Sequence, residues 1–307
     1  MRLRRGDLDV VRVSNDVLTL CFLPEVGGRL ISLTVGGAEL LWRNPAWLRE
    51  DLSPVTAYAD WPATDGTMGS WVNVGGSKTW PAPQGWDGPD EWAGPPDPVL
   101  DAGAYAVLFS TSPEGDRVTL TSSDDPRTGV RIRREFALPP SGGWFSHTAS
   151  LTNVSARPVR WSAWEVTQVD TSLGGEVVVD ATDDPLSLLV AEGSPAWSAQ
   201  AGRVHVPVQP TVAKLGFPQA TGRLAYRRGD GAGLVQETTV TPGAAYPDGG
   251  CPVELWLQHP LPEPLEEFGG LHPDAHLVEL ETLSPLTELA PGESVTLAVD
   301  WRCSPPS

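Results

Sequence analysis

Short runs in which apolar and polar residues alternate recur along almost the whole chain, and the spacing typical of amphipathic helices is nearly absent. Examples are "DVLTLCFL", "AYAVLFST", "GVRIRREFAL" and "SVTLAVDWR". Turn-forming residues separate these runs at intervals of roughly 8–12 residues, which is typical of an all-β sandwich. Strands this numerous, without helices between them, pair in antiparallel fashion. Because no linker or fixed-period repeat interrupts the series, the sequence predicts one large antiparallel β-sandwich domain spanning residues 1–307.

Residues 45–100 depart from this pattern, because they contain little strand periodicity, and we expect them to form a long loop or lid. Loops of this length within a compact domain tend to be functional. The segment is rich in tryptophan, with Trp47, Trp61, Trp71, Trp80, Trp86 and Trp92. Indole rings can cover an open end of a sandwich, and they can also stack on the apolar faces of sugars. The sequence leaves both roles open.

The charge balance narrows the classes of partner. The chain has 39 acidic and 21 basic residues and a formal net charge of −18, which argues against nucleic acid and anionic membrane surfaces, since both require clustered positive charge. No apolar run approaches about 18 residues, and the N-terminus lacks the apolar core of a signal peptide. The three cysteines form no CxxC pair or zinc-type cluster. We therefore expect a cytoplasmic protein with reduced thiols and no cofactor.

Three stretches resemble a known superfamily. "NDVLTLCFLPEVGGRLISLTVGGAELLW" is similar to the opening of the galactose-mutarotase-like (aldose 1-epimerase-like) proteins, with a strand, a glycine pair and a second strand. "HLVELETLSPLTELAPGESVTLAVDW" resembles their closing hairpin, and "LTNVSARPVRWSAWEVTQVD" resembles their central turn between long strands. With "NVGGSKTWPAPQGW" added, the chain is more similar to an uncharacterised branch than to the true aldose 1-epimerases. The resemblance covers nearly the whole chain and implies a β-supersandwich with a small-molecule carbohydrate as ligand.

The resemblance also implies a catalytic base on a late strand. In the epimerases a glutamate on that strand takes the proton of the anomeric hydroxyl, and Glu281 in "VELETLSP" is the matching residue. Because side chains alternate along a strand, Glu279 shares the face of Glu281 and is expected to contact substrate. Two carboxylates on one buried face are costly unless that face lines a wet cleft. The alternative is a face that is simply exposed to solvent.

The matching acid departs from the family pattern. The epimerases have a histidine on the central strand, where this chain has Glu165 in "SAWEVTQVD". Glu165 alternates with Trp161 and Ala163, and burial in such an apolar row would raise its pKa, as a general acid requires. A buried glutamate satisfied by the backbone or by an arginine, with no catalytic duty, is the alternative. His259, at the end of "VELWLQHP", is the reserve candidate for the acid.

One lysine in the tryptophan-rich segment needs a separate explanation. Among the 21 basic residues only Lys78 and Lys214 are not arginine. In the epimerases an early loop supplies an Asn–Arg pair that holds sugar hydroxyls, and the resemblance puts Asn73 and Lys78 in that place. Lysine is a compact charge with three donors, whereas arginine is a planar fork suited to carboxylates or phosphates. Alternatively, Lys78 pairs with Asp87 or Glu91 and stiffens the loop.

Three further residues complete the predicted substrate site. Trp80 and Trp86 are expected to form its wall beside Lys78, and Arg29, after the glycine pair, can reach the same cleft or cap the sheet edge. A divalent metal is not expected, because the side chains that could hold one are irregularly spaced. These side chains are His259, His272, Glu279 and Glu281.

These residues support three competing functions. The first is an epimerase-like enzyme acting at or near the anomeric carbon of a sugar, with Glu281 as base and Glu165 or His259 as acid. The second is a non-catalytic carbohydrate-binding module, favoured by the tryptophans and the missing family histidine. The third is a glycoside-cleaving enzyme that uses the same carboxylates. A site on the concave face of one sheet would leave the other sheet free to form a homodimer.

Overall fold

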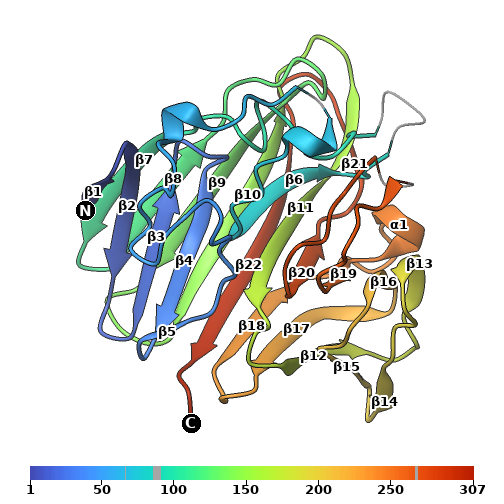
Figure 1. The fold of residues 1–307 in the computed structure, drawn as a ribbon. Helices are drawn as coiled ribbons and strands as arrows, with labels where there is room; N and C mark the ends of the chain where they lie inside the picture. The colour runs from blue at the N-terminus through green and yellow to red at the C-terminus, as the bar shows by residue number, and fades with distance from the viewer. Residues whose placement is uncertain (66, 86–90, 267–268) are drawn as a thin grey trace.

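Two antiparallel sheets hold nearly all of the regular structure in a computed structural model that describes residues 1–65, 67–85, 91–266 and 269–307 (Figure 1). The all-β, antiparallel sandwich predicted from the alternating pattern is confirmed. Helices are short in these ranges. They are the single turn α1 (Pro247–Gly250) and the 3-10 helices η1 (Tyr58–Asp60) and η2 (Met68–Ser70).

The first sheet carries the candidate site described below. Its strands are β1 (Arg2–Arg5), β2 (Leu8–Ser14), β3 (Leu18–Leu23), β4 (Arg29–Val35), β5 (Ala38–Glu39), β6 (Ser77–Ala82), β11 (Val159–Asp170), β13 (Leu186–Glu192), β16 (Val212–Phe217), β19 (Val253–Gln258), β20 (Leu277–Leu283) and β21 (Thr287–Leu289). They are ordered β1-β2-β3-β4-β6-β11-β20-β19-β16-β13, while β5 pairs with β4 and β21 with β11. Strands from both halves of the sequence therefore meet at the centre of the sheet.

The second sheet packs behind the first. Its strands are β7 (Ala106–Ser112), β8 (Gly115–Thr121), β9 (Val130–Leu138), β10 (Trp144–Asn153), β12 (Gly175–Ala181), β14 (Ser198–Gln200), β15 (Arg203–Pro207), β17 (Ala220–Arg228), β18 (Gly233–Thr238) and β22 (Ser294–Ser304). Their order is β14-β15-β12-β17-β18-β22-β10-β9-β8-β7.

The main core lies between the sheets, and β22 shows how the sequence builds it. Its buried residues alternate with exposed ones along the whole strand, as expected where one face meets the core and the other meets solvent. Strand β11 differs, because it is buried on both faces from Trp161 to Val169. One face of β11 belongs to the core, and the other belongs to the cleft in which the candidate site lies.

Strand β6 lies within residues 45–100, for which the sequence predicts a long loop or lid with little strand structure. It pairs with β11 along its whole length but meets β4 only at Ser77. Pro81 has no N–H for a sheet ladder, and it is tolerated because the β4 side of β6 has no strand partner at that point. The surrounding glycines and prolines concealed this strand in the sequence, so Lys78 and Trp80 lie on a sheet rather than on a lid.

The tryptophans of residues 45–100 divide between covering the sheet and lining the cleft. Trp47 and Trp61 pack on a second hydrophobic cluster, which lies on the opposite face of β2–β4 from the main core and includes Leu8 and Ile31. Trp92 is buried against Trp80, with ring centres 5.0 Å apart, and its Nε1 donates to Asp97. Trp71 and Trp80 line the cleft. Trp86 lies outside the described residues.

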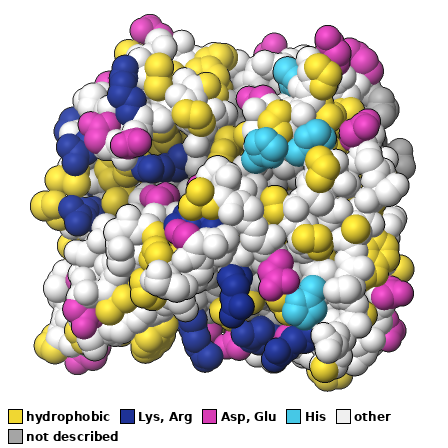
Figure 2. Space-filling view, turned by 60° about the horizontal axis from the view of Figure 1, so that its bottom comes forward, with side chains coloured by type: hydrophobic (Ala, Val, Ile, Leu, Met, Phe, Trp, Pro, Cys, Tyr) yellow, Lys and Arg dark blue, Asp and Glu magenta, His cyan; other side chains and the backbone are white. Residues whose placement is uncertain are grey.

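The surface in Figure 2 mixes acidic, basic and apolar side chains without one kind covering the whole face. In the described ranges, no helix has the length and apolar character needed to cross a membrane.

Candidate functional site

The candidate site is a cleft on the face of the first sheet that points away from the second sheet. Strand register places side chains from β6, β11, β20, β19 and β16 in two adjacent rows on this face. One row is Lys78, Val166, Glu281 and Glu254, and the other is Gln168, Glu279, Trp256 and Lys214. Residues more than 200 positions apart in the sequence thus become neighbours through strand pairing alone.

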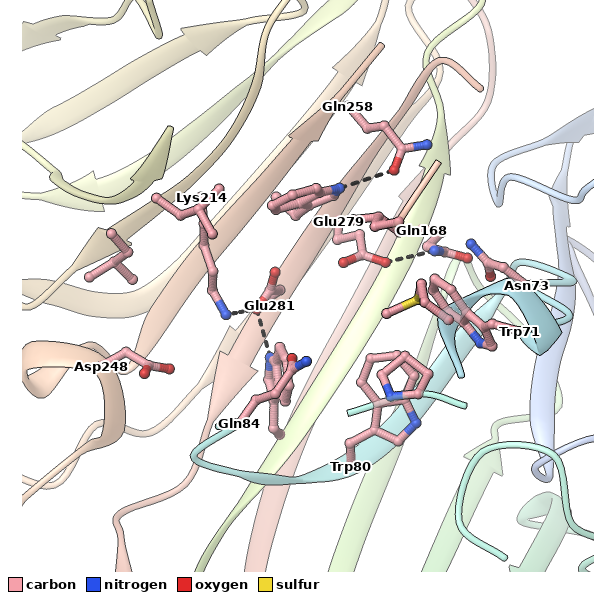
Figure 3. Close-up of a pocket in the computed structure, with 17 residues that line it drawn as sticks. Trp71, Asn73, Trp80, Gln84, Gln168, Lys214, Asp248, Gln258, Glu279 and Glu281 are labelled. Carbon is pink, nitrogen blue, oxygen red and sulfur yellow. Dashed lines mark hydrogen bonds and ion pairs between the residues drawn. The ribbon is translucent and has the colours of Figure 1, made fainter. Parts of the chain in front are cut away.

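The cleft has a volume of about 350 Å³ and aromatic walls (Figure 3). Its tryptophans are Trp71, Trp80, Trp164 and Trp256, and its side-chain amides are Asn73, Gln84, Gln168 and Gln258. A cleft of this size, with aromatic walls and a few convergent polar groups, is typical of a small-molecule site.

The two carboxylate oxygens of Glu281 differ: Oε2 has bonding partners, whereas Oε1 has none among the described residues. Its Oε2 accepts a hydrogen bond from Trp164 Nε1 at 2.7 Å and lies 3.2 Å from Lys214 Nζ. Its Oε1 has no partner within the described ranges, and Figure 3 shows the side chain projecting into the cleft between Lys214 and Glu279. Burial raises the pKa of Glu281, Lys214 opposes this, and the Glu279 charge adds to it. A fixed carboxylate of raised pKa is suited to accepting a proton.

Lys214 holds two carboxylates together. Its Nζ lies 2.7 Å from Glu254 Oε2 as well as 3.2 Å from Glu281 Oε2, and 4.4 Å from the centre of the Trp164 ring. Burial alone would lower the pKa of Lys214, but the charges of Glu254 and Glu281 outweigh it and raise the pKa above the usual lysine value. The side chain therefore stays cationic.

Lys78 and Glu279 form a second pair beside the first. Glu279 Oε1 accepts a hydrogen bond from Gln168 Nε2 at 2.6 Å and lies 3.4 Å from Lys78 Nζ. The Lys78 ammonium is buried 4.3 Å from the centre of the Trp80 ring. Burial lowers the pKa of Lys78 to about 8, although the charge of Glu279 opposes the shift. The unusual lysine is thus a buried cation that is not itself a lining residue but pairs with Glu279, which lines the cleft.

Glu165 does not share the cleft with Glu281, which corrects the predicted placement of the acid. Its side chain leaves the opposite face of β11 and is fully buried between the sheets. There it accepts hydrogen bonds from Thr79 Oγ1 at 2.5 Å, from Arg134 at 2.8 Å and from Ser77 Oγ. Burial raises the pKa of Glu165 against the opposing charge of Arg134. The alternative of a buried glutamate satisfied by an arginine describes this residue.

The remaining predicted residues are divided between the cleft and its surroundings. Asn73 lines the cleft, as do Trp80 and Glu279. His259 is half-buried at the end of β19, with its ring centre 6.4 Å from that of His276, and it is not part of the cleft wall. No histidine within the described ranges lines the cleft.

Arg29 does not line the cleft but contacts a residue that holds one of the cleft tryptophans. It is fully buried and paired with Asp101, whose Oδ2 accepts a hydrogen bond from Trp71 Nε1 at 2.9 Å. Arg29 therefore positions a tryptophan of the wall rather than meeting a ligand itself.

Sequence reasoning missed Lys214, Glu254 and Asp248. One signal for Lys214 was available, because it is the only lysine besides Lys78 in a chain that otherwise uses arginine. Glu254 could have been found from the alternation of "VELWLQ", which places it on one strand face with Trp256. Asp248 lies in a short turn without strand periodicity, and no sequence signal marked it.

Comparisons with known proteins agree with this fold. Residues 8–192 match the model of a family described as a domain of unknown function, DUF4380. Because the match takes in more than half of the chain, the protein belongs to that family. No curated protein matches the chain.

Solved structures extend the comparison to the whole chain. A galactose mutarotase-like protein from Lactobacillus casei is 12% identical, with a TM-score of 0.57 over 96% of this chain and 100% of that one. A presumed aldose 1-epimerase from Escherichia coli is 16% identical, with a TM-score of 0.57 over 97% and 99% of the two chains.

A TPR-domain containing protein from Parabacteroides distasonis is 14% identical, with a TM-score of 0.62 over 98% of this chain and 48% of that one. This chain therefore spans about half the length of that protein. The likenesses establish the galactose mutarotase-like fold, as the sequence resemblance implied.

Proposed function

We propose that the protein binds a sugar in this cleft and interconverts configurations at or near its anomeric carbon, as an isomerase of the aldose 1-epimerase type. The observation that carries the proposal is the state of Glu281: one carboxylate oxygen is fixed by Trp164 and Lys214, and the other is open to the cleft. The mutarotase-like fold and the aromatic walls support the same conclusion.

The chemistry requires one base and one acid around a single sugar ring. Glu281 Oε1 takes the proton of the anomeric hydroxyl while the bond between the anomeric carbon and the ring oxygen breaks. The ring oxygen takes up a proton, which gives the open-chain aldehyde. After rotation about the adjacent carbon–carbon bond, the same transfers run in reverse and close the ring with the other configuration. Both enzyme groups then regain their starting protonation states.

Glu279 and Lys78 are the proposed source of the second proton. Alternate side chains on one strand face are separated by about 7 Å, so Glu279 and Glu281 can stand on either side of a bound ring. Glu279 meets the ring oxygen and passes on a proton from Lys78, to which it is paired. The lowered pKa of Lys78, about 8, suits proton donation near neutral pH.

Anomer interconversion is the direct test. Exchange between the α and β forms would be followed by NMR saturation transfer across a panel of neutral, amino and phosphorylated aldoses. We expect the wild-type protein to accelerate exchange for at least one of these sugars. Exchange at the spontaneous rate for every sugar in the panel, at millimolar concentration and several pH values, would contradict the proposal.

The pH dependence of the same reaction is expected to be bell-shaped. Activity requires Glu281 to be ionised and, because its pKa is raised, activity should fall as the pH drops through a value above the ordinary glutamate pKa of about 4.3. Activity also requires Lys78 to be protonated, so it should fall as the pH rises through about 8. In Lys78→Arg the positive charge is kept but the side chain cannot give up its proton, so catalysed exchange should fall at every pH. Exchange as fast as in the wild type would exclude Lys78 as the proton source.

A non-catalytic carbohydrate-binding module is the second candidate, favoured by the absence of histidine from the cleft wall in the described ranges. It predicts sugar binding that survives Glu281→Gln and fails in Trp71→Ala, because the half-buried Trp71 ring lines the cleft. Titration of the tryptophan fluorescence would measure both affinities. Turnover of any bound sugar would count against this candidate.

A further inference from the structure

The carboxylates around the cleft outnumber the ammonium groups, so not every charged group has a partner of opposite charge. Lys214 is held by Glu254 and Glu281, and Lys78 is paired with Glu279. Each ammonium also lies against a tryptophan ring. Both positive charges therefore have carboxylate partners.

Asp248 is the carboxylate without a direct partner among the described residues, although its charge is near enough to Lys214 to help raise the pKa of that lysine. It lies in the single turn α1 and lines the cleft on the side of Lys214 (Figure 3). Its side chain makes no hydrogen bond or ion pair with any residue that the structure describes. With φ 51° and ψ 53°, its backbone adopts the left-handed conformation, which aspartate tolerates better than most residues. The carboxylate is thus presented to the cleft with its acceptor capacity unused.

Several other unmatched atoms at the cleft are acceptors, whereas Trp80 Nε1 is a buried donor without a partner in the described ranges. Glu281 Oε1 and Glu279 Oε2 have no partner in the described part of the chain. The side chain of Gln168 is 1% exposed, its Nε2 is bound to Glu279, and its Oε1 is enclosed without a partner. A buried acceptor left unpaired is costly, so this wall favours a ligand rich in hydrogen-bond donors.

The net charge of the residues around the cleft also favours a ligand that donates hydrogen bonds, and in particular a cationic one. Among the charged residues that line the cleft, one ammonium group, of Lys214, faces three carboxylates, of Glu279, Glu281 and Asp248. Lys78 and Glu254 are buried beside this lining and add one positive and one negative charge. Burial raises the pKa of Glu254 well above its usual value, and a proton retained there still leaves the balance negative. A phosphate or carboxylate on the ligand would meet like charge in a partly desolvated cleft, whereas a cation would meet its complement.

We propose that the ligand is an amino sugar, an aldose with a free ammonium group, and that Asp248 binds the ammonium. This inference rests on the proposed function in that it places the sugar in the same cleft. The ammonium supplies both the missing positive charge and several donors, while a neutral aldose supplies donors only. A charge-assisted hydrogen bond from the ammonium to Asp248 is about twice as strong as a neutral one.

Binding measurements on purified protein test the inference separately from catalysis. Tryptophan fluorescence would be titrated with D-glucosamine, N-acetyl-D-glucosamine, D-glucose and D-glucose 6-phosphate at a mildly acidic pH, where the free amine is protonated. The variants are Asp248→Asn, which keeps the shape and removes the charge, and Asp300→Asn as the matched control. Asp300 is exposed on β22 of the second sheet.

We expect wild type and Asp300→Asn to bind glucosamine roughly tenfold more tightly than glucose or N-acetylglucosamine, and to bind the phosphate least. Asp248→Asn should lose that preference. Equal affinity for glucosamine and glucose, tighter binding of the phosphate, or a preference that persists in Asp248→Asn would overturn the inference.

Anomer exchange measured on the same samples separates the two proposals. A preference for glucosamine without accelerated exchange removes the isomerase and leaves the amino-sugar site. Accelerated exchange of neutral aldoses without that preference removes only the amino-sugar site. Failure to bind any of the four sugars removes the amino-sugar site, and the isomerase is then judged on the full panel of aldoses.

Discussion

Replacing Glu281 with glutamine is expected to slow enzyme-catalysed anomer exchange by about 10²–10⁴-fold. The amide retains the shape of the carboxylate and one oxygen that can accept from Trp164 Nε1, but it cannot take the proton of the anomeric hydroxyl. Lys214 keeps Glu254 as a partner at 2.7 Å, so the wall should not be left with an unpaired cation. Sugar affinity should therefore change much less than the rate constant.

Glu288→Gln is the control for this prediction, because Glu288 is exposed on β21. Rates of exchange and sugar affinities would be compared for wild type, Glu281→Gln and Glu288→Gln under one set of conditions. A Glu281→Gln protein that exchanges anomers as fast as wild type would exclude Glu281 as the base. A parallel loss of affinity and rate would instead indicate that the substitution damages binding.

The sequence was sufficient to predict the sandwich because most strands have one face in the core and one in solvent. On β20 the same alternation placed Glu279 and Glu281 on one face, and the structure puts both in the cleft. Local periodicity is enough for such inferences, because each requires only the direction of neighbouring side chains along one strand.

The alternation of apolar and polar residues cannot show which face of a strand meets the other sheet when both faces are buried. On β11, the row with Ala163 and Glu165 and the row with Trp164 and Gln168 are equally enclosed. Nothing in the local pattern says which row meets the other sheet. The deciding partner of Glu165 is Arg134 on β9 of the second sheet, and that pairing exists only once the two sheets have packed.

The polar wall of the cleft was concealed for a similar reason. Lys214, Glu254 and Glu281 come from three strands, and each looks like an ordinary charged residue within its own strand. Their neighbouring positions follow from the order β20-β19-β16 in the sheet, which the sequence of one chain does not specify. Rarity was the only local clue, since each of the two lysines of the chain pairs with a carboxylate that lines the cleft.

The buried pair of Arg134 and Glu165 provides the second large expected effect, which concerns stability. Both side chains are fully buried, and Arg134 also donates to the carbonyl oxygens of Gly28 and Ser77 at 2.9 Å. Arg134 thereby ties β9 of the second sheet to β6 and β11 of the first. Removing one member of such a pair leaves the other charge buried without compensation, which is more costly than losing the attraction itself.

Glu165→Gln is accordingly expected to lower the free energy of unfolding by about 3–5 kcal/mol, measured by urea denaturation. Asp124→Asn is the control: it breaks an ion pair with Arg131 whose side chains are 46% and 53% exposed, so its effect should be about 0–1 kcal/mol. The double variant Arg134→Met/Glu165→Leu removes both charges and should be more stable than Glu165→Gln, because neither charge is then buried alone.

Similar losses for Glu165→Gln and Asp124→Asn would show that the buried charge is compensated by other groups. Because Glu165 lies outside the cleft, any Glu165→Gln protein that remains folded should still bind sugar, whereas a selective loss of binding would return this residue to the site.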